Sequence, residues 1–507
     1  MEQLLQKRLV SVGRCVLDCQ EECAVAADYT LPEYCPDIAV VLKCLVTPRV
    51  QNRQWSGEQL LLDGVAEIRV LYLDEERRCL REVEFTHPLS CALYAGERVD
   101  TALVMLELTP KYVNCRAVGP RRLEVRGAIT VTARAECASQ MEVMEAEESG
   151  GLYTRCESAT VSAPAAMAEK LFTVSETLDF PETQPPAALF LGGECRAVVR
   201  ECKVLTGKAI VKGEVFVHQL YTDDSDGGST YCLDYTVPFS QILDVDGATE
   251  GQTCTADVLL LSDTQRPAVG PNGETRVLDF TAKLLVQLQV HVHGAVSLLL
   301  DAYHSRCPVT LEQKEQSFRA QLGGRWEATT LPMQLDLPAG PLEELMDVWV
   351  QPQGILGECG QGTARLSGRL LICMLVRDGD GQIAYYERPE EYQLEYPCPG
   401  NRVSAKATVM LLRYRVAEGK LELQVTLNVV LRPTQQIEKK ILTGVRLCTE
   451  TPYPAQRASV LLYYAQAGEE LWEIGRSCHA SPQCILEENG LGSERLTQPT
   501  VLTVPLV

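Results

Sequence analysis

Apolar and polar residues alternate along much of the chain. In the segments 66–72 and 421–427 apolar residues hold every second position, which is the two-residue period of a β-strand with one buried face. Alternation of this kind is typical of antiparallel sheets that a core covers on one side. The pattern therefore predicts a mainly β protein.

One stretch of this alternation occurs three times in the same frame. Each copy has a Gly, a Leu seven residues later and an Asp ten residues after the Gly: Gly64, Leu71 and Asp74; Gly213, Leu220 and Asp223; Gly368, Leu375 and Asp378. A polar turn, a second alternating strand, a Gly-containing stretch and further strands follow each Asp. We expect the Gly to mark a bulge or a close backbone approach, and the Asp to begin a turn. The repetition predicts three antiparallel β-sandwich-like domains.

Three polar or small-residue stretches mark the predicted domain boundaries, at 144–151, 312–316 and 451–455. They predict β domains over residues 1–143, 152–311 and 317–450, and a small α+β unit over 456–507. A chain of 507 residues is too long for one core and suits about three or four domains. Within the first and third domains we expect short helix-like pieces at Ala39–Leu42, with Asp37 as its cap, and at Leu342–Leu345.

The C-terminal residues follow a different pattern, which predicts strand, turn, helix, helix and strand. Gly468 ends an aromatic strand, and the next segment places Leu471, Trp472 and Ile474 at near-helical spacing. A second helix is signalled by Ser481 as N-cap before Pro482, and its end by Asn489-Gly490. We expect Trp472 and Ile474 to hold the small core of this unit rather than to contact a ligand.

Charge and cysteine content narrow the functional classes. A net charge of -21 disfavours nucleic acid and anionic lipid as partners, because such binding needs concentrated Lys and Arg. The 21 cysteines are scattered and odd in number, so we expect buried thiols, including Cys15, Cys19 and Cys23, in a reducing cytosol. Neither a secretory signal nor a stretch of about eighteen apolar residues is visible, which predicts a cytoplasmic protein without a membrane span.

Motifs for catalysis are absent from the sequence. It contains no G-x-S-x-G elbow, phosphate-binding lysine loop, H-E-x-x-H or paired CxxC pattern. The pair His291 and His293 could offer two metal ligands from one face of a strand, but we favour two surface histidines with ordinary partners. We therefore expect no enzyme activity, no catalytic residue, no metal and no cofactor.

The C-terminal order of elements resembles a LysM module. The family's turn, helix, N-x-L and closing I-P have counterparts in this sequence in Gly468-Glu-Glu-Leu471, Trp472, Ile474, Asn489, Leu491 and Val504-Pro505. Glu469-Glu470 stand where the family usually has Asp-Thr, and Gln498-Pro499-Thr500 replace its Gly-Gln. The resemblance implies a groove lined by Gly468, Glu469, Glu470, Asn489, Gly490 and Leu491. Adjacent glutamates at a helix N-terminus present negative charge, which suits a basic protein surface better than a neutral glycan.

The first repeat opens with Leu31-Pro32 and Pro36-Asp37-Ile38, and this entry motif together with the Gly, Leu-Tyr and Asp frame resembles the SPOCS domain of the SipL family. The second repeat reduces the motif to Phe180-Pro181 and Pro185, and the third keeps only Leu337-Pro338. Three such units followed by a LysM-like module are also the order found in the SipL family. The resemblance therefore extends over nearly the whole chain.

The SipL-like resemblance implies a non-enzymatic adaptor of spore coat assembly in the mother cell, at the forespore surface. Its implied partner is a coat-basement ATPase of the SpoIVA type, docked through the LysM-like module, with other coat proteins or a second copy as further candidates. The alternative is a protein of the cell wall or cortex that binds the N-acetylglucosamine chains of peptidoglycan. A visible export signal would have favoured that alternative.

Overall fold

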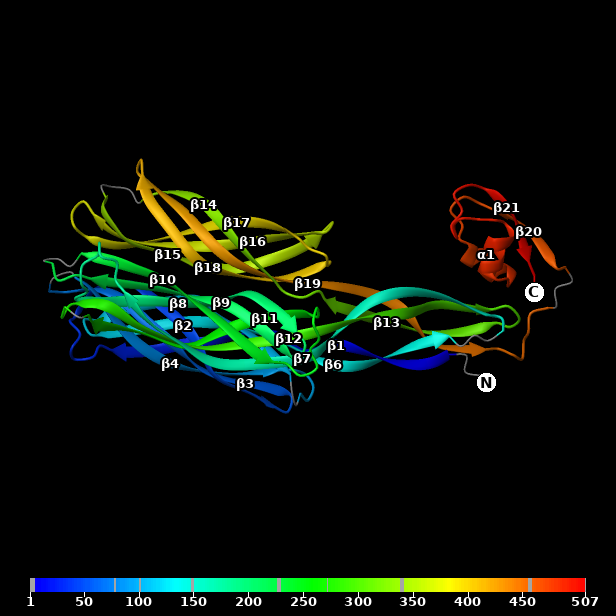
Figure 1. The fold of residues 1–507 in the computed structure, drawn as a ribbon, viewed down its shortest axis with the longest axis horizontal. Helices are drawn as coiled ribbons and strands as arrows, with labels where there is room; N and C mark the ends of the chain where they lie inside the picture. Colours follow the sequence, from blue (N-terminus) through cyan, green and yellow to red (C-terminus); the bar gives the residue numbers. More distant parts are fainter. Residues whose placement is uncertain are drawn as a thin grey trace.

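The computed structural model describes residues 5–76, 79–99, 102–146, 150–225, 229–270, 272–337, 342–454 and 458–506. Antiparallel strands make up most of these residues, and the two helices among them are short and lie near the C-terminus. The predicted mainly β class with antiparallel sheets is confirmed. Figure 1 shows an elongated molecule with a wide body, a narrow stem and a small unit at the far end of the stem.

The strands follow one another in three sets that correspond to the repeats. The first set is β1 (Leu5–Thr30), β2 (Ile38–Ser56), β3 (Gln59–Asp74), β4 (Leu80–Tyr94), β5 (Leu103–Gly119) and β6 (Arg122–Ala146). The second is β7 (Leu152–Asp179), β8 (Leu189–Leu205), β9 (Lys208–Thr222), β10 (Thr230–Asp244), β11 (Thr253–Val269) and β12 (Thr275–His304). The third is β13 (Val309–Gln321), β14 (Arg325–Asp336), β15 (Leu342–Gly360), β16 (Thr363–Asp378), β17 (Ile383–Pro397), β18 (Arg402–Ala417) and β19 (Lys420–Leu447).

Each set forms two sheets around one core. In the first, β2-β3-β4 face β1-β6-β5; in the second, β8-β9-β10 face β7-β12-β11; in the third, β15-β16-β17 face β13, β14, β18 and β19. The alternation seen in the sequence explains the cores, because the apolar residues of every second position point inward. Ala66, Ile68 and Val70 on β3 are fully buried, as are Leu421 and Val425 on β19.

The shared Gly and Asp have the roles that the sequence predicts. A Cβ atom at Gly213 would overlap the carbonyl oxygen of Val198 and the ring of Phe239, so only Gly permits this approach of neighbouring strands. The carboxylate of Asp378 accepts backbone bonds from Asp380 and Gln382 at 3.0 and 2.8 Å, which closes the turn between β16 and β17. Asp223 holds the equivalent turn of the second repeat through Ser225 and Ser229.

The entry motif closes one end of the first core. The Tyr72 hydroxyl donates to the carbonyl of Pro36 at 3.2 Å, while Arg121 binds the carbonyl of Pro32 and the carboxylate of Asp37. The second repeat keeps the tyrosine: the Tyr221 hydroxyl donates to the carbonyl of Pro185 at 2.9 Å. A proline-rich segment held by a tyrosine is therefore common to these two repeats.

The three repeats do not stay separate, because their longest strands leave the sheets and meet in the stem. The stem contains the β1/β6, β7/β12 and β13/β19 ribbons, which enclose a common core of Val143, Val161, Val296, Leu298, Phe318 and Ile441. A second apolar cluster at its far end joins Leu5, Leu299, Ala302, Leu442 and Val445. At the opposite end of the body, Leu73, Leu220 and Leu375 belong to one further cluster to which all three repeats contribute.

Two sequence predictions about helix-like segments are wrong. Ala39–Leu42 and Leu342–Leu345 begin strands β2 and β15, not helices, because each pairs with a central strand. The polar segment 312–316 lies inside β13, and β12 ends at His304 before it. Part of the boundary at 144–151, and residue 455 of the boundary at 451–455, lie outside the described residues. The thiols of Cys15, Cys19 and Cys23 lie along β1 with Cys15 exposed, which corrects the expectation of buried thiols.

Candidate functional site

The C-terminal unit has the element order that the sequence predicts. It consists of β20 (Val460–Ala465), α1 (Leu471–Cys478), α2 (Pro482–Glu488) and β21 (Thr500–Pro505). Ser481 caps α2 by accepting a bond from the Cys484 amide at 3.2 Å, and Asn489 lies at the C-cap. The helices cover one face of the β20-β21 pair over a core that includes Leu471, Ile474, Ile485, Leu502 and Val504.

The first half of the predicted groove is the turn between β20 and α1. Gly468 has a φ of 94°, a left-handed conformation that favours Gly, and its amide donates to the Leu496 carbonyl at 2.7 Å. The Glu469 carboxylate accepts a bond from the Gln466 amide at 2.8 Å, and burial together with Glu469 raises the pKa of Tyr463. Glu470 precedes the first residue of α1 and pairs with Arg155 of the stem at 2.9 Å. One of the two glutamates thus already has a basic partner within the chain.

The second half of the predicted groove follows α2. The Asn489 side chain bonds in both directions with Thr503 of β21, at 2.8 Å each, so its amide group holds α2 to the sheet. Gly490 is exposed with a φ of 58°, and Leu491 packs against the core of the unit. The two halves meet through the following segment, because the amide of Leu471 donates to the carbonyl of Glu494 at 2.8 Å.

Trp472 has a different place from the one predicted. It is 7% exposed, but it packs outside the core of its own unit, against Tyr303 near the end of β12, with ring centroids 4.9 Å apart. Its indole nitrogen donates to the Asp301 carboxylate at 2.9 Å. The residue therefore attaches the C-terminal unit to the stem, whereas Ile474 belongs to the core as expected. Helical periodicity identifies a buried face but not the surface that buries it.

Further contacts attach the C-terminal unit to the stem, and we call this contact region the seat. The Tyr303 hydroxyl donates to the Ala480 carbonyl at 2.7 Å, and burial beside Tyr153 raises its pKa well above the ordinary value, so it stays a donor at neutral pH. Arg476 pairs with Asp301 at 2.7 Å. A side chain at Gly475 would overlap the Tyr303 hydroxyl, so this helix face must be flat. These contacts therefore hold the C-terminal unit against the stem; Figure 1 shows the unit at the far end of the stem.

The C-terminal unit exposes an apolar surface that was not predicted from the sequence. The outer face of the β20-β21 pair, opposite the helices, carries Val460, Leu462, Tyr464 and Val501, which are 51%, 61%, 73% and 52% exposed. We call these four residues the outer patch. Large apolar side chains gathered on one exposed face are typical of protein interaction sites. Their alternation with Tyr463 and Ala465 along β20 was the signal that could have indicated them.

The expectation of two surface histidines with ordinary partners is wrong for His291. His291 is 1% exposed, and among the described residues neither of its ring nitrogens has a hydrogen-bond partner. Burial and the nearby His293 lower its pKa to about 4. His293 is exposed and lies 2.8 Å from the Gln321 carbonyl. A register shift at Val290/His291 accompanies their different environments and breaks the simple strand alternation.

One comparison with known proteins identifies a domain within the second repeat. Residues 191–262 match the family model described as SipL, SPOCS domain. The chain contains a SipL-type SPOCS domain. The match begins in β8 and ends in β11, so it includes the shared Gly213, Leu220 and Asp223. It confirms the predicted SipL-like resemblance for this repeat. No curated protein and no solved structure matches the chain.

Helix length bears on the prediction that the chain has no membrane span. Helices α1 and α2 have eight and seven residues, and within the described parts of the chain none is long and apolar enough to span a bilayer.

Proposed function

We propose that this SPOCS-domain protein is a non-enzymatic adaptor of spore coat assembly that docks a protein partner through its C-terminal unit. The SPOCS match supports the link to sporulation. The outer patch is the observation that supports docking. Leu462 and Tyr464 are large, apolar and more than half exposed, and they lie on a unit that is held at the end of a stem. The stem places this surface away from the body (Figure 1).

The proposed partner is a coat-basement ATPase of the SpoIVA type, as the SipL-like resemblance implies. The proposed site combines the groove residues Gly468, Glu469, Glu470, Asn489, Gly490 and Leu491 with the neighbouring outer patch. An apolar centre beside charged residues suits a protein interface, in which apolar anchors supply affinity and the polar rim supplies specificity. Within the groove, Glu469 pairs with no Lys or Arg in the part of the chain that the structure describes, whereas Glu470 pairs with Arg155. Glu469 is therefore the better candidate for contact with a basic partner surface.

The stem and the body would act as spacer and scaffold. Ion pairs join the repeats to one another: Lys43 pairs with Glu387, Arg49 with Asp263, and Arg432 with Asp257 at 3.1 Å. The Arg49 and Asp263 side chains are almost completely buried, which supports a fixed arrangement of the first two repeats. We propose a location in the mother cell at the forespore surface.

The second candidate function is binding to peptidoglycan through the same LysM-like unit. The specific observation behind it is the strand, helix, helix, strand order of the C-terminal elements. Retention of the purified full-length chain on an immobilised SpoIVA-type ATPase, and in parallel on insoluble peptidoglycan, distinguishes the two. We expect retention on the ATPase alone. Retention on peptidoglycan alone would contradict the adaptor and support a role in the wall or cortex.

A further inference from the structure

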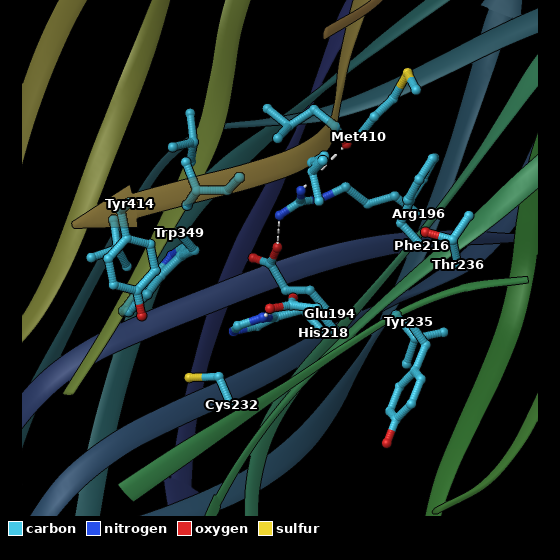
Figure 2. A pocket seen from close by; sticks show the side chains of 17 residues that line it. Glu194, Arg196, Phe216, His218, Cys232, Tyr235, Thr236, Trp349, Met410 and Tyr414 are labelled. Carbon is cyan, nitrogen blue, oxygen red and sulfur yellow. Dashed lines mark hydrogen bonds and ion pairs between the residues drawn. The ribbon is translucent and has the colours of Figure 1, made fainter. Parts of the chain in front are cut away.

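Three potential metal ligands of different chemistry meet where the second repeat contacts the third. They are His218 on β9, Cys232 on β10 and Asp347 on β15, and one ligand atom from each lies within 4.8 Å of the others. His218 and Cys232 also line a cavity of about 100 Å³ beside Trp349 and Tyr414. Figure 2 shows His218 and Cys232 close together in this pocket.

The separations between these atoms are those of ligands around one small ion. The Nε2 atom of His218 lies 3.2 Å from Asp347 Oδ2, and the Sγ atom of Cys232 lies 3.2 Å from Asp347 Oδ1. Tetrahedral zinc has bonds of about 2.0–2.3 Å to nitrogen, oxygen and sulfur, which places neighbouring ligands about 3.2–3.8 Å apart. Small side-chain rotations would therefore bring the three atoms to a common ion.

The groups around the ligands also suit a metal. Asp234 Oδ1 lies 2.8 Å from His218 Nδ1, so a carboxylate orients the imidazole and directs Nε2 toward the cluster. The Val348 amide donates to Asp347 Oδ1 at 2.7 Å and fixes that carboxylate. A thiolate and a carboxylate together balance the charge of a divalent ion, and a water from the adjoining cavity can complete a four-ligand shell.

The same position in the other repeats is occupied differently. The residue five places after the shared Gly is Arg69 in the first repeat, His218 in the second and Cys373 in the third. Each faces an acidic residue on the next strand: Glu84, Asp234 and Glu387. In the first repeat a permanent cation pairs with the acid, since Arg69 lies 3.9 Å from Glu84.

Replacement of that cation by an imidazole, with a thiol added from β10, gives the second repeat the donor types that zinc prefers. We propose that His218, Cys232 and Asp347 bind one zinc ion that fastens the second repeat to the third. Because β15 supplies Asp347 and β9 and β10 supply the other two ligands, the ion would join two repeats through residues more than a hundred positions apart in sequence. The proposed metal site lies between SPOCS-like units and is independent of the proposed docking surface.

Cobalt uptake by the full-length chain tests this proposal. After removal of metals with a chelator, Co²⁺ is titrated and the near-ultraviolet charge-transfer absorption of cobalt-bound thiolate is followed. We expect Cys232→Ser to bind one equivalent fewer than the wild type. The control Cys195→Ser removes a half-buried thiol from β8 of the same repeat and should bind as the wild type does. Since other cysteines can also take up cobalt, the difference between variants is the decisive quantity.

A thermal measurement makes the test independent of the absorption band. Zinc should raise the Tm of the wild type and of Cys195→Ser, but not that of Cys232→Ser or Asp347→Asn, because an ion bound to the folded state stabilises it. Circular dichroism in the presence of chelator shows whether each variant folds, and Asp347→Asn serves if Cys232→Ser does not. Equal cobalt uptake and an equal zinc-dependent rise in Tm for wild type and both site variants would overturn the proposal.

Discussion

The indole nitrogen of Trp472 donates a hydrogen bond to the carboxylate of Asp301 at 2.9 Å, across the contact between the C-terminal unit and the stem. The two residues are far apart in sequence, and the Trp472 ring also meets Tyr303 at an angle of 66°. The segment that connects β19 to the C-terminal unit is also fixed. The Tyr453 amide donates to the Arg306 carbonyl at 2.8 Å, and the Tyr453 ring stacks on His479. These contacts hold the outer patch in a defined orientation relative to the stem.

Trp472→Ala should release the C-terminal unit from the stem without unfolding it. The variant loses an aromatic contact and a bond to a carboxylate, which together contribute about 2–4 kcal/mol. Hydrogen exchange should increase at the seat, including residues 299–303, while β20 and β21 stay protected. Ile474→Ala is the matched control: it removes a core residue at a cost of about 2–5 kcal/mol and should raise exchange throughout the unit. Equal loss of protection in β20 for both variants would show that Trp472 stabilises the core of the unit and not only its contact with the stem.

Glu469→Lys should weaken docking of the proposed ATPase about tenfold, because the reversed charge would face a basic partner. The Tm should fall only by the small amount that the lost bond from the Gln466 amide contributes. Binding is measured by surface plasmon resonance at low and moderate salt, where a charge contact loses strength as salt rises. Glu470→Lys, by contrast, would also oppose Arg155 and loosen the seat on the stem. An unchanged affinity for Glu469→Lys would remove the acidic rim from the binding site.

Gly213→Ala should destabilise the second repeat by about 1–3 kcal/mol, since the added methyl group overlaps the Val198 carbonyl and the Phe239 ring. Urea unfolding measures the free energy. Gly294→Ala on β12 is the control, because nothing in the described chain lies within 4 Å of its added Cβ and its backbone is not left-handed. If the two variants were equally stable, the close approach of strands at Gly213 would not be the reason for its recurrence.

His291 should make the stability of the fold depend on pH. Its pKa is about 4 in the folded state and about 6.5 in an unfolded chain, so between these values the unfolded state binds more protons. The free energy of unfolding therefore falls as pH drops from about 6.5 to 4, by up to about 3 kcal/mol from this residue. His291→Leu should lose this part of the pH dependence in urea titrations at several pH values. His87→Gln on β4 should keep it, and parallel curves for wild type and His291→Leu would contradict the assignment.

The repeat and the local structure within each hairpin could be predicted from the sequence. Alternation at Ala66, Ile68 and Val70 predicted their burial, and the recurrence of Gly213 and Asp378 predicted a close strand approach and a turn, because these effects depend on neighbours in one hairpin. The match at residues 191–262 confirms the SPOCS resemblance for the second repeat.

The stem and the contact of the C-terminal unit with it could not be predicted from the sequence. The extension of β1, β7 and β13 into one shared core depends on contacts between repeats, and single-sequence periodicity contains no record of those contacts. For the same reason Trp472 was predicted as a core residue, and the joint of His218 with Asp347 could not be seen from positions more than a hundred residues apart.

The affinity of the full-length chain for a SpoIVA-type ATPase, compared between Tyr464→Asp and Tyr112→Asp, tests the proposed docking function most directly. Both tyrosines are more than half exposed, but Tyr464 belongs to the outer patch and Tyr112 to β5 in the body. A charge in the centre of an apolar interface should weaken binding at least tenfold, so we expect this loss for Tyr464→Asp and wild-type affinity for Tyr112→Asp. Wild-type affinity for Tyr464→Asp, or no binding of the unmodified chain, would contradict docking through the C-terminal unit.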